Sequence, residues 1–310
     1  MVIGIDNGNA NTKTVNVVFT SGITEHDVKP PAIADEILNF NGKYYTLSGN
    51  RAMYARDKTK NDTCFILTLF AIAKQILAQN QYAPVLDIDL GVGLPPEHYS
   101  RQREKFADYF MKFGETVEFD YNDKHFIVNI MSVNVFPQAF AAVAPKSSDL
   151  KSYSRTYIVD IGGYTTDILL LSKGKPDLTY CRSLETGIIT MNNKIKGKIS
   201  TAYDMKIEEE HIYDVLFDKK TVLNQEIKNE IKKECSIHTA MILNQLRELG
   251  IDLRTNPAIF LGGGSLLLRE FIENSDMTSV VEFIPDISAN AVGYTILTSA
   301  KLKKKSAANN

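Results

Sequence analysis

Short apolar runs alternate with polar turns along most of this chain. Where a run is continuous or rich in β-branched residues, a buried strand is predicted. The predicted strands lie at 2–5, 12–20, 43–47, 85–92, 117–135 (as one or two strands), 157–161 and 168–172, with a further strand in "AIFL".

Helices are predicted where the apolar positions fit a helical period or follow a capping residue. Asp62 is a candidate N-cap for an apolar helix that ends near Ala78. An amphipathic helix follows "GVGLPP", with proline near its start. The other predicted helices are a short one in "FPQAFAAV", a largely helical region at 190–249 with a long helix from 222 to 249, one after "FLGGGS", and a last one at 290–304.

Two polar segments interrupt this alternation. Residues 22–60 are turn-rich and are interpreted as a small insertion or subdomain. Residues 146–155 follow Pro145 and carry four serines, which makes them the best candidate for a boundary between two halves. A length of 310 residues is also typical of about two domains.

Composition and charge narrow the classes of protein. Hydrophobic residues make up 44% and charged residues 23%, an ordinary soluble balance, and a net charge of −2 indicates neither nucleic acid nor an anionic membrane as a partner. We expect no membrane span, no signal peptide and no structural zinc site. Three scattered cysteines suit a reducing cytosol. The basic run at 301–305 is interpreted as a solvated helix end, with contact to an acidic partner as the alternative.

An internal repeat carries the main functional signal. "VIGIDNGNANTKTVNVV" and "YIVDIGGYTTDILLL" both read as an apolar strand, an aspartate, one residue, a glycine, a short polar turn and a second strand. Asp6 and Asp160 take the same place in the two copies, about half the chain apart. The repeat therefore predicts two related halves, each opening with a β-hairpin.

The chemistry of these turns favours a phosphate cradle. Small residues let successive backbone N–H groups converge on one anion. Asn9, Asn11, Thr165 and Thr166 add side-chain donors, and Lys13 adds a cation. The aspartates would hold the water shell of a Mg²⁺ ion, since like charges keep them from phosphate itself. A single Asp-x-Gly hairpin is usually a plain turn, so the second copy is what strengthens this interpretation.

A third glycine-rich element supports the same interpretation. "FLGGGS" at 260–265 reads as a strand, three glycines and a helix start, where the backbone can approach a ligand closely. No Gly-Lys-Ser/Thr follows, so this is not a Walker A loop, and the spacing differs from the dinucleotide fingerprint. A tight strand–helix connection is the alternative.

Taken in order, these motifs resemble the actin, heat-shock chaperone and sugar kinase superfamily of ATPases. "IGIDNGNANTK" and "VDIGGYTTDI" resemble its two phosphate loops, "FPQAFAAV" and "SANAVGYTIL" its two connecting helices, and "IFLGGGSLL" its adenosine loop. The resemblance runs nearly end to end. Within the superfamily, the chain is most similar to the bacterial and archaeal actin-like proteins of the ParM/StbA plasmid-segregation group. Asn9 stands where many members carry Ser or Thr.

The resemblance implies an α/β fold with two actin-like (ribonuclease H-like) domains around a nucleotide cleft, each with a small subdomain. Domain I would span 1–148, with a C-terminal helix at 288–305 packing back on it, and domain II would span 149–287. Two facing hairpins would clamp a polyphosphate between the halves.

Site roles also follow from the resemblance. The cofactors would be ATP and Mg²⁺, and Asp6 and Asp160 would hold the metal through water. Gln138 would orient the attacking water, with Asp160 as the other catalytic residue; a plain polar helix start is the alternative for Gln138. The phosphate-binding residues would be Gly8, Asn9, Asn11, Lys13, Gly162, Gly163, Tyr164, Thr165 and Thr166. The nucleoside-binding residues would be Gly187, Gly262, Gly263, Gly264 and Ser265.

The function implied is a cytoplasmic, filament-forming ATPase that hydrolyses ATP, or GTP, when it polymerises. It would drive plasmid DNA segregation through a small DNA-binding adaptor at a centromere-like site, without direct contact to nucleic acid or membrane. One alternative is a sugar or acyl kinase of the same fold, and another is a chaperone or activator ATPase. The sequence leaves open the filament geometry, the adaptor, and a plasmid, phage or cell-shape role.

Overall fold

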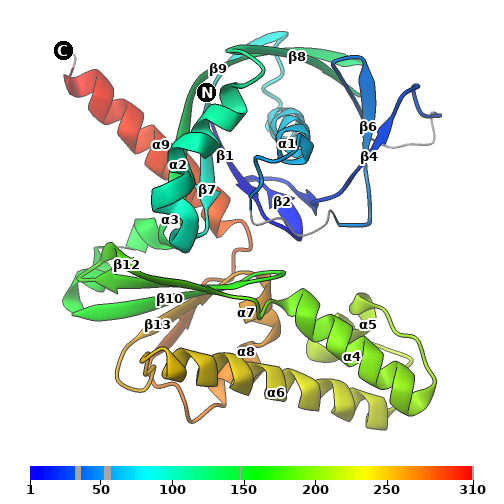
Figure 1. Ribbon diagram of the computed structural model, residues 1–310, viewed down its shortest axis with the longest axis vertical. Coiled ribbons are helices and arrows are strands. Elements are labelled where there is room, and N and C mark those ends of the chain that lie inside the picture. The colour runs from blue at the N-terminus through cyan, green and yellow to red at the C-terminus, as the bar shows by residue number, and fades with distance from the viewer. Residues whose placement is uncertain (32–35, 52–56, 147, 309–310) are drawn as a thin grey trace. The chain divides into compact units, whose positions relative to one another are not determined.

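The computed structural model describes residues 1–31, 36–51, 57–146 and 148–308. The chain forms two compact units: unit 1 is Met1–Lys146 with Ser288–Asn310, and unit 2 is Ser147–Ile287 (Figure 1). Parts of the predicted 22–60 insertion and residue 147 of the predicted boundary lie outside the described residues. Each unit is built on one β-sheet with helices.

The sheet of unit 1 has nine strands in its described part, in the order β3-β2-β1-β7-β9-β8-β5-β6-β4. β1, β7 and β9 run parallel, and the remaining pairs are antiparallel. The strands are β1 (Val2–Asn7), β2 (Asn11–Lys13), β3 (Val18–Thr20), β4 (Ile23–His26), β5 (Ile37–Phe40), β6 (Lys43–Leu47), β7 (Val85–Leu94), β8 (Thr116–Tyr121) and β9 (Lys124–Pro137). β5 pairs with β8, so the strands β4, β5 and β6 of the 22–60 segment extend this sheet.

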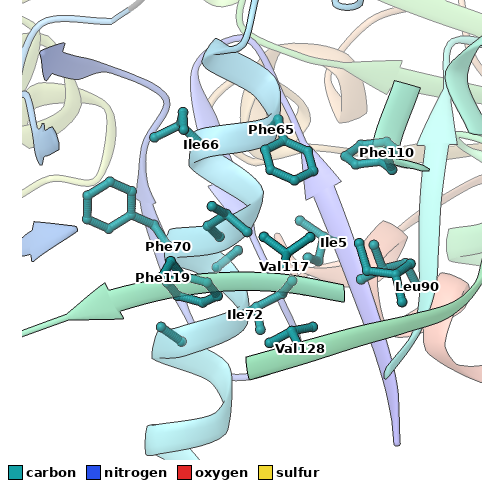
Figure 2. Packing of buried hydrophobic residues seen from close by; sticks show 14 of the residues in the cluster. Ile5, Phe65, Ile66, Phe70, Ile72, Leu90, Phe110, Val117, Phe119 and Val128 are labelled. Carbon is teal, nitrogen blue, oxygen red and sulfur yellow. The ribbon is translucent and has the colours of Figure 1, made fainter. Parts of the chain in front are cut away.

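Helix α1 (Thr63–Ala78) is the centre of the unit 1 core, and the curved sheet wraps around it (Figure 1). Its sequence is apolar on nearly every side, which is what a helix enclosed by a sheet requires. Figure 2 shows Phe65, Phe70 and Ile72 of α1 among side chains from the surrounding strands, including Ile5 and Val128. Burial of these large side chains supplies most of the driving force for folding the unit.

The described part of unit 1 has four further helical segments: α2 (Pro96–Met111), α3 (Phe140–Val143), the 3₁₀ turn η1 (Ala144–Lys146) and α9 (Ala289–Ala308). α9 packs on β1 and β7 although it ends the chain. Its approach is close: a Cβ on Gly4 would lie 2.1 Å from the carbonyl oxygen of Ala291, and the Gly4 N–H donates to Thr295 Oγ1 at 3.0 Å. The C-terminal helix is therefore part of the N-terminal unit.

Unit 2 has a five-stranded sheet in the order β12-β11-β10-β13-β14. Its strands are β10 (Arg155–Ile161), β11 (Thr166–Ser172), β12 (Lys175–Leu184), β13 (Ala258–Leu261) and β14 (Val281–Phe283). Its helices are η2 (Asp149–Ser152), α4 (Ile188–Tyr203), α5 (Glu209–Leu216), α6 (Gln225–Glu248), α7 (Gly263–Leu267) and α8 (Arg269–Glu273). Isoleucines and leucines of α4 and α6 join Phe260 of β13 in the second core.

Most predicted elements are confirmed, including both hairpins, the long helix and the helix with proline at its start. The single strand predicted at 12–20 is wrong, because the chain turns between β2 and β3. Thr14 explains the turn: its N–H donates to the Val17 carbonyl at 2.8 Å, and its hydroxyl accepts from the Val17 N–H at 3.1 Å. Strands β4, β5, β12 and β14 were not predicted.

Two helix starts also differ from the prediction. α1 does begin after Asp62, but the carboxylate of Asp62 makes no capping hydrogen bond and pairs with Lys112 instead. Asp62 has a helical backbone (φ −86°, ψ −4°), whereas a capping residue is normally extended. The helix after "FLGGGS" is divided at Leu268 into α7 and α8.

Within the described residues, no helix combines the length and the apolar character needed to cross a membrane.

Candidate functional site

The first hairpin joins β1 to β2, with Asp6 opposite Lys13 and Asn7 opposite Thr12. Its turn is tight, because a Cβ on Gly8 would lie only 2.6 Å from the carbonyl oxygen of Asn11. The Gly8 carbonyl accepts from Ser21 Oγ at 2.6 Å, which holds the turn against the residue after β3. Gly8, Asn9 and Asn11 remain partly exposed, so a ligand can reach this turn.

Gln138 and Lys13 both face Asp6. The Gln138 side-chain amide donates to Asp6 Oδ1 at 3.1 Å, and Lys13 Nζ lies 4.0 Å from Asp6 Oδ2. Asp6 is 5% exposed and Gln138 is 9% exposed. β1, β2 and the segment after β9 thus bring together three predicted site residues that are far apart in the sequence.

Gln138 precedes the short helix α3, which starts at Phe140. Ala139, between them, has a left-handed backbone (φ 62°), and its N–H donates to Asn290 Oδ1 of α9 at 2.9 Å. The Gln138 N–H donates to the Leu94 carbonyl at the end of β7, at 2.8 Å. Backbone contacts to two other elements therefore fix the direction of the Gln138 side chain.

The Asp6 environment suits a hydrated cation better than a directly ligated one. Among the described residues there is no group of three or more His, Cys, Asp or Glu side chains that could hold a metal ion. Mg²⁺ keeps several of its waters in proteins and needs only one or two carboxylates. Asp6, oriented by Gln138, fits that role.

The second hairpin joins β10 to β11 and repeats the plan of the first. Asp160 lies opposite Asp167, and Ile161 opposite Thr166. The turn closes with a hydrogen bond from the Gly162 N–H to the Thr165 carbonyl at 2.8 Å. Its four residues are partly exposed: Gly162, Gly163, Tyr164 and Thr165.

Asp167 is a site candidate that the sequence reasoning missed. It shares a register position with Asp160 and is 5% exposed. Thr165 Oγ1 donates to Asp167 Oδ2 at 3.2 Å. The signal was present in the motif, since the "TTD" that ends the turn places a second acidic residue on the return strand of the hairpin.

Gly187 lies directly against this second turn. Its N–H donates to the Tyr164 carbonyl at 3.0 Å, and the next two N–H groups donate to the carbonyls of Gly162 and Gly163. A Cβ on Gly187 would lie 2.3 Å from the Gly163 carbonyl oxygen, so only glycine fits. Helix α4 therefore starts on the hairpin and directs its positive end toward it.

The glycine-rich loop at 262–265 also lies against the second hairpin, beside its first strand β10. β13 pairs with β10, with Leu261 opposite Asp160. Gly262 has a left-handed backbone (φ 85°), and a Cβ there would lie 2.4 Å from Asp160 Oδ1. Gly264 packs on Ile161, Gly263 has open space beside it, and the buried Ser265 hydroxyl donates to the Gly262 carbonyl at 2.8 Å.

A series of buried polar groups links the second hairpin to helix α6. Thr186 Oγ1 donates to Thr166 Oγ1 at 3.0 Å, and Nε2 of His238 on α6 lies 3.0 Å from the Thr186 carbonyl oxygen. His238 is 5% exposed, and this burial lowers its pKa below the ordinary value. The ring is therefore neutral at neutral pH.

The predicted site residues thus form one cluster in each unit. The cluster of unit 1 comprises Asp6, Gly8, Asn9, Asn11, Lys13 and Gln138. The cluster of unit 2 comprises Asp160, Gly162, Gly163, Tyr164, Thr165, Thr166, Gly187, Gly262, Gly263, Gly264 and Ser265.

Solved structures similar to this chain define the class of fold. An archaeal actin homologue, Ta0583, in complex with ADP is 20% identical with a TM-score of 0.73, covering 96% of this chain and 99% of that one. ParM from Bacillus thuringiensis with ATP is 11% identical (TM-score 0.69; coverage 97% and 98%). An Alp12 filament structure is 16% identical (TM-score 0.68; coverage 97% and 98%). The fold is that of actin-like proteins.

Two family models match the sequence itself. Residues 4–140 match the N-terminal domain of actin-like proteins, and residues 158–274 match the C-terminal domain of the archaeal actin homologue MreB-like family. The chain belongs to the actin-like proteins, which confirms the resemblance seen in its motifs. No match was found in a comparison with curated proteins.

Proposed function

We propose that this protein is a cytoplasmic ATPase that binds ATP with Mg²⁺ and assembles into filaments. The observation that carries the proposal is the pair of hairpins of the same design, one in each unit. Each hairpin has an aspartate on its first strand and a half-exposed turn of small and polar residues. Two such turns suit a polyphosphate, because converging N–H groups and hydroxyls favour anions.

The residue roles that we propose are those the resemblance implies, and the geometry of the two hairpins is compatible with them. Gly8, Asn9, Asn11 and Lys13 would bind the β-phosphate side, and the second turn from Gly162 to Thr166 would bind the γ-phosphate. The nucleoside would rest on Gly187 and the loop at 262–265. Gln138, held in one direction by its bond to Asp6, would orient the attacking water.

Asp6 and Asp160 would hold Mg²⁺ through its waters. When bound, such an ion would neutralise charge on the phosphates as the terminal one is transferred. Asp167, opposite Asp160, would add a third carboxylate to the same shell. Hydrolysis therefore depends on how these carboxylates are positioned more than on any covalent step by the protein.

Filament formation is supported by relatives of the same fold. The Alp12 and AlfA structures are filaments, and AlfA comes from the Bacillus subtilis plasmid pLS32. By analogy, ATP would favour assembly of this chain and hydrolysis would loosen it. Plasmid segregation through a DNA-binding adaptor is the role we propose, and the net charge of −2 agrees with indirect contact to DNA.

The test is sedimentation of the purified protein with ATP, with ADP and without nucleotide, with phosphate release measured in parallel. We expect pelleting with ATP and much less with ADP. Asp160→Ala should slow phosphate release by roughly a hundredfold while the circular dichroism spectrum stays the same. Asp108→Ala, which removes an exposed carboxylate on α2, is the control and should behave as wild type.

Two results would count against the proposal. Protein that binds ATP but stays monomeric at every concentration would remove the filament role. Phosphate transfer to a sugar or carboxylic acid, without assembly, would identify a kinase instead.

A further inference from the structure

A second lysine contacts the first hairpin besides Lys13. Lys58 lies in the loop between β6 and α1, and its ammonium group donates to the backbone carbonyl of Asn7. Asn7 is the last residue of β1 and directly precedes Gly8 in the turn. Lys58 is half-buried as a residue, and this contact places its charge against the hairpin.

Residues 57–61, which carry Lys58, are held by hydrogen bonds on both sides of it. Asp57 accepts hydrogen bonds from the Thr59 N–H at 3.0 Å and the Thr59 hydroxyl at 2.6 Å, and its other oxygen accepts from Lys105 Nζ of α2 at 2.7 Å. These bonds hold the pKa of Asp57 down at about 2. After Lys58, the Asn61 carbonyl accepts from Tyr109 Oη at 2.8 Å. These hydrogen bonds on either side of Lys58 hold the backbone that carries it.

Lys58 differs from nearby lysines in its counter-ion. Lys74, Lys105 and Lys112 each pair with a carboxylate. In the described part of the chain no carboxylate forms an ion pair with Lys58, and its recorded acceptor is a backbone carbonyl. A half-buried ammonium with two more N–H donors and no carboxylate partner is stabilised when an anion is bound beside it.

We propose that Lys58 is a binding residue for the phosphates of a nucleoside di- or triphosphate at the first hairpin, acting together with Lys13. Lys13 is compensated in part by Asp6 at 4.0 Å, whereas Lys58 brings an uncompensated positive charge to the turn. This inference rests on the proposed nucleotide function and adds a phosphate contact to it. The alternative is that Lys58 only ties its loop to β1.

The test compares nucleotide affinity in four proteins: wild type, Lys58→Met, Lys58→Arg and Lys60→Met. Lys60 is exposed two residues away and serves as the matched control. We expect Lys58→Met to bind ATP and ADP roughly tenfold to a hundredfold more weakly, as for loss of a charged hydrogen bond. Lys58→Arg should recover most of the affinity, and Lys60→Met should match wild type. Adenosine affinity should be equal in all four, since adenosine carries no phosphate.

A second measurement does not depend on the folding of a variant. Wild-type protein is acetylated with limiting acetic anhydride, and the modification of Lys58 and Lys60 is measured by mass spectrometry. We expect ATP to protect Lys58 and leave Lys60 unchanged, while adenosine protects neither.

The outcomes distinguish the role of Lys58 from the proposed ATPase function. If wild type binds ATP, equal affinity in Lys58→Met, or Lys58 left unprotected by ATP, would overturn the role of Lys58 and leave the ATPase proposal standing. If wild type binds no nucleoside triphosphate, both are overturned.

Discussion

In both candidate site clusters, hydrogen bonds connect side chains that are far apart in the sequence. Gln138 and Asp6 are 132 positions apart, yet one hydrogen bond of 3.1 Å fixes both. In unit 2, Thr166, Thr186 and His238 form a buried polar chain under the second hairpin. Of these groups, the buried His238 ring titrates, so its protonation state contributes directly to stability.

The clearest residue-scale prediction concerns pH and His238. Burial lowers the pKa of its ring, so the folded protein resists protonation at a pH where the unfolded chain accepts a proton. The contribution to stability is complete above the ordinary value of 6.5 and is lost as the pH falls below it. Urea unfolding should therefore show a lower free energy of unfolding at mildly acidic than at neutral pH.

The control for this prediction is His238→Gln, which keeps a donor for the Thr186 carbonyl and removes the titrating ring. Its free energy of unfolding should change less with pH across the same range. The same slope in both proteins would show that other groups cause the pH dependence.

At the scale of elements, the start of helix α4 is the contact that organises unit 2. Three successive N–H groups from Gly187 onward donate to the carbonyls of the second hairpin turn. A helix start normally needs a capping side chain. Here the hairpin backbone supplies the acceptors, and Gly187 makes no side-chain cap.

Gly187, at the start of α4, and Gly197, in its middle, should respond in opposite ways to substitution by alanine. Gly187→Ala places a Cβ 2.3 Å from the Gly163 carbonyl oxygen, so the helix start must move, at a cost of about 1–3 kcal/mol. Gly197→Ala, in the middle of α4 with nothing within 4 Å, should stabilise by about 0.5–1 kcal/mol. Chemical denaturation measures both. A stabilising Gly187→Ala would contradict the close contact.

At the scale of the whole molecule, the chain leaves unit 1 after Lys146 and returns to it at Ser288. The returning helix α9 packs on β1 and β7, and its Tyr294 is fully buried. Unit 1 therefore needs both ends of the sequence, while unit 2 is one continuous segment.

Truncation tests this discontinuity. A chain that ends at Ile287 lacks α9 and should lose several kcal/mol of stability or fail to fold unit 1, because the faces of β1 and β7 that α9 covers become exposed. A chain that ends at Ala300 keeps Tyr294 and loses only the largely exposed basic end, so it should unfold near wild type. The measurement is thermal unfolding by circular dichroism. Equal midpoints for the two truncations would refute the role of α9.

The sequence by itself determined the two hairpins, the main helices and the actin-like family. Hydrophobic periodicity and glycine turns are encoded by neighbouring residues, so they can be recognised without knowledge of tertiary contacts. It did not reveal the turn at 14–17, the strands β4, β5, β12 and β14, or the missing cap on Asp62. Two of these features involve partners distant in the chain: Asp62 pairs with Lys112, and the Asn16 N–H in the turn donates to Gln75 Oε1 of α1 at 3.1 Å. The "TTD" motif placed Asp167 on the return strand, but only the tertiary structure decided that its register pairs it with Asp160 and that Lys58 lies on the first hairpin, since register and loop placement are set by packing.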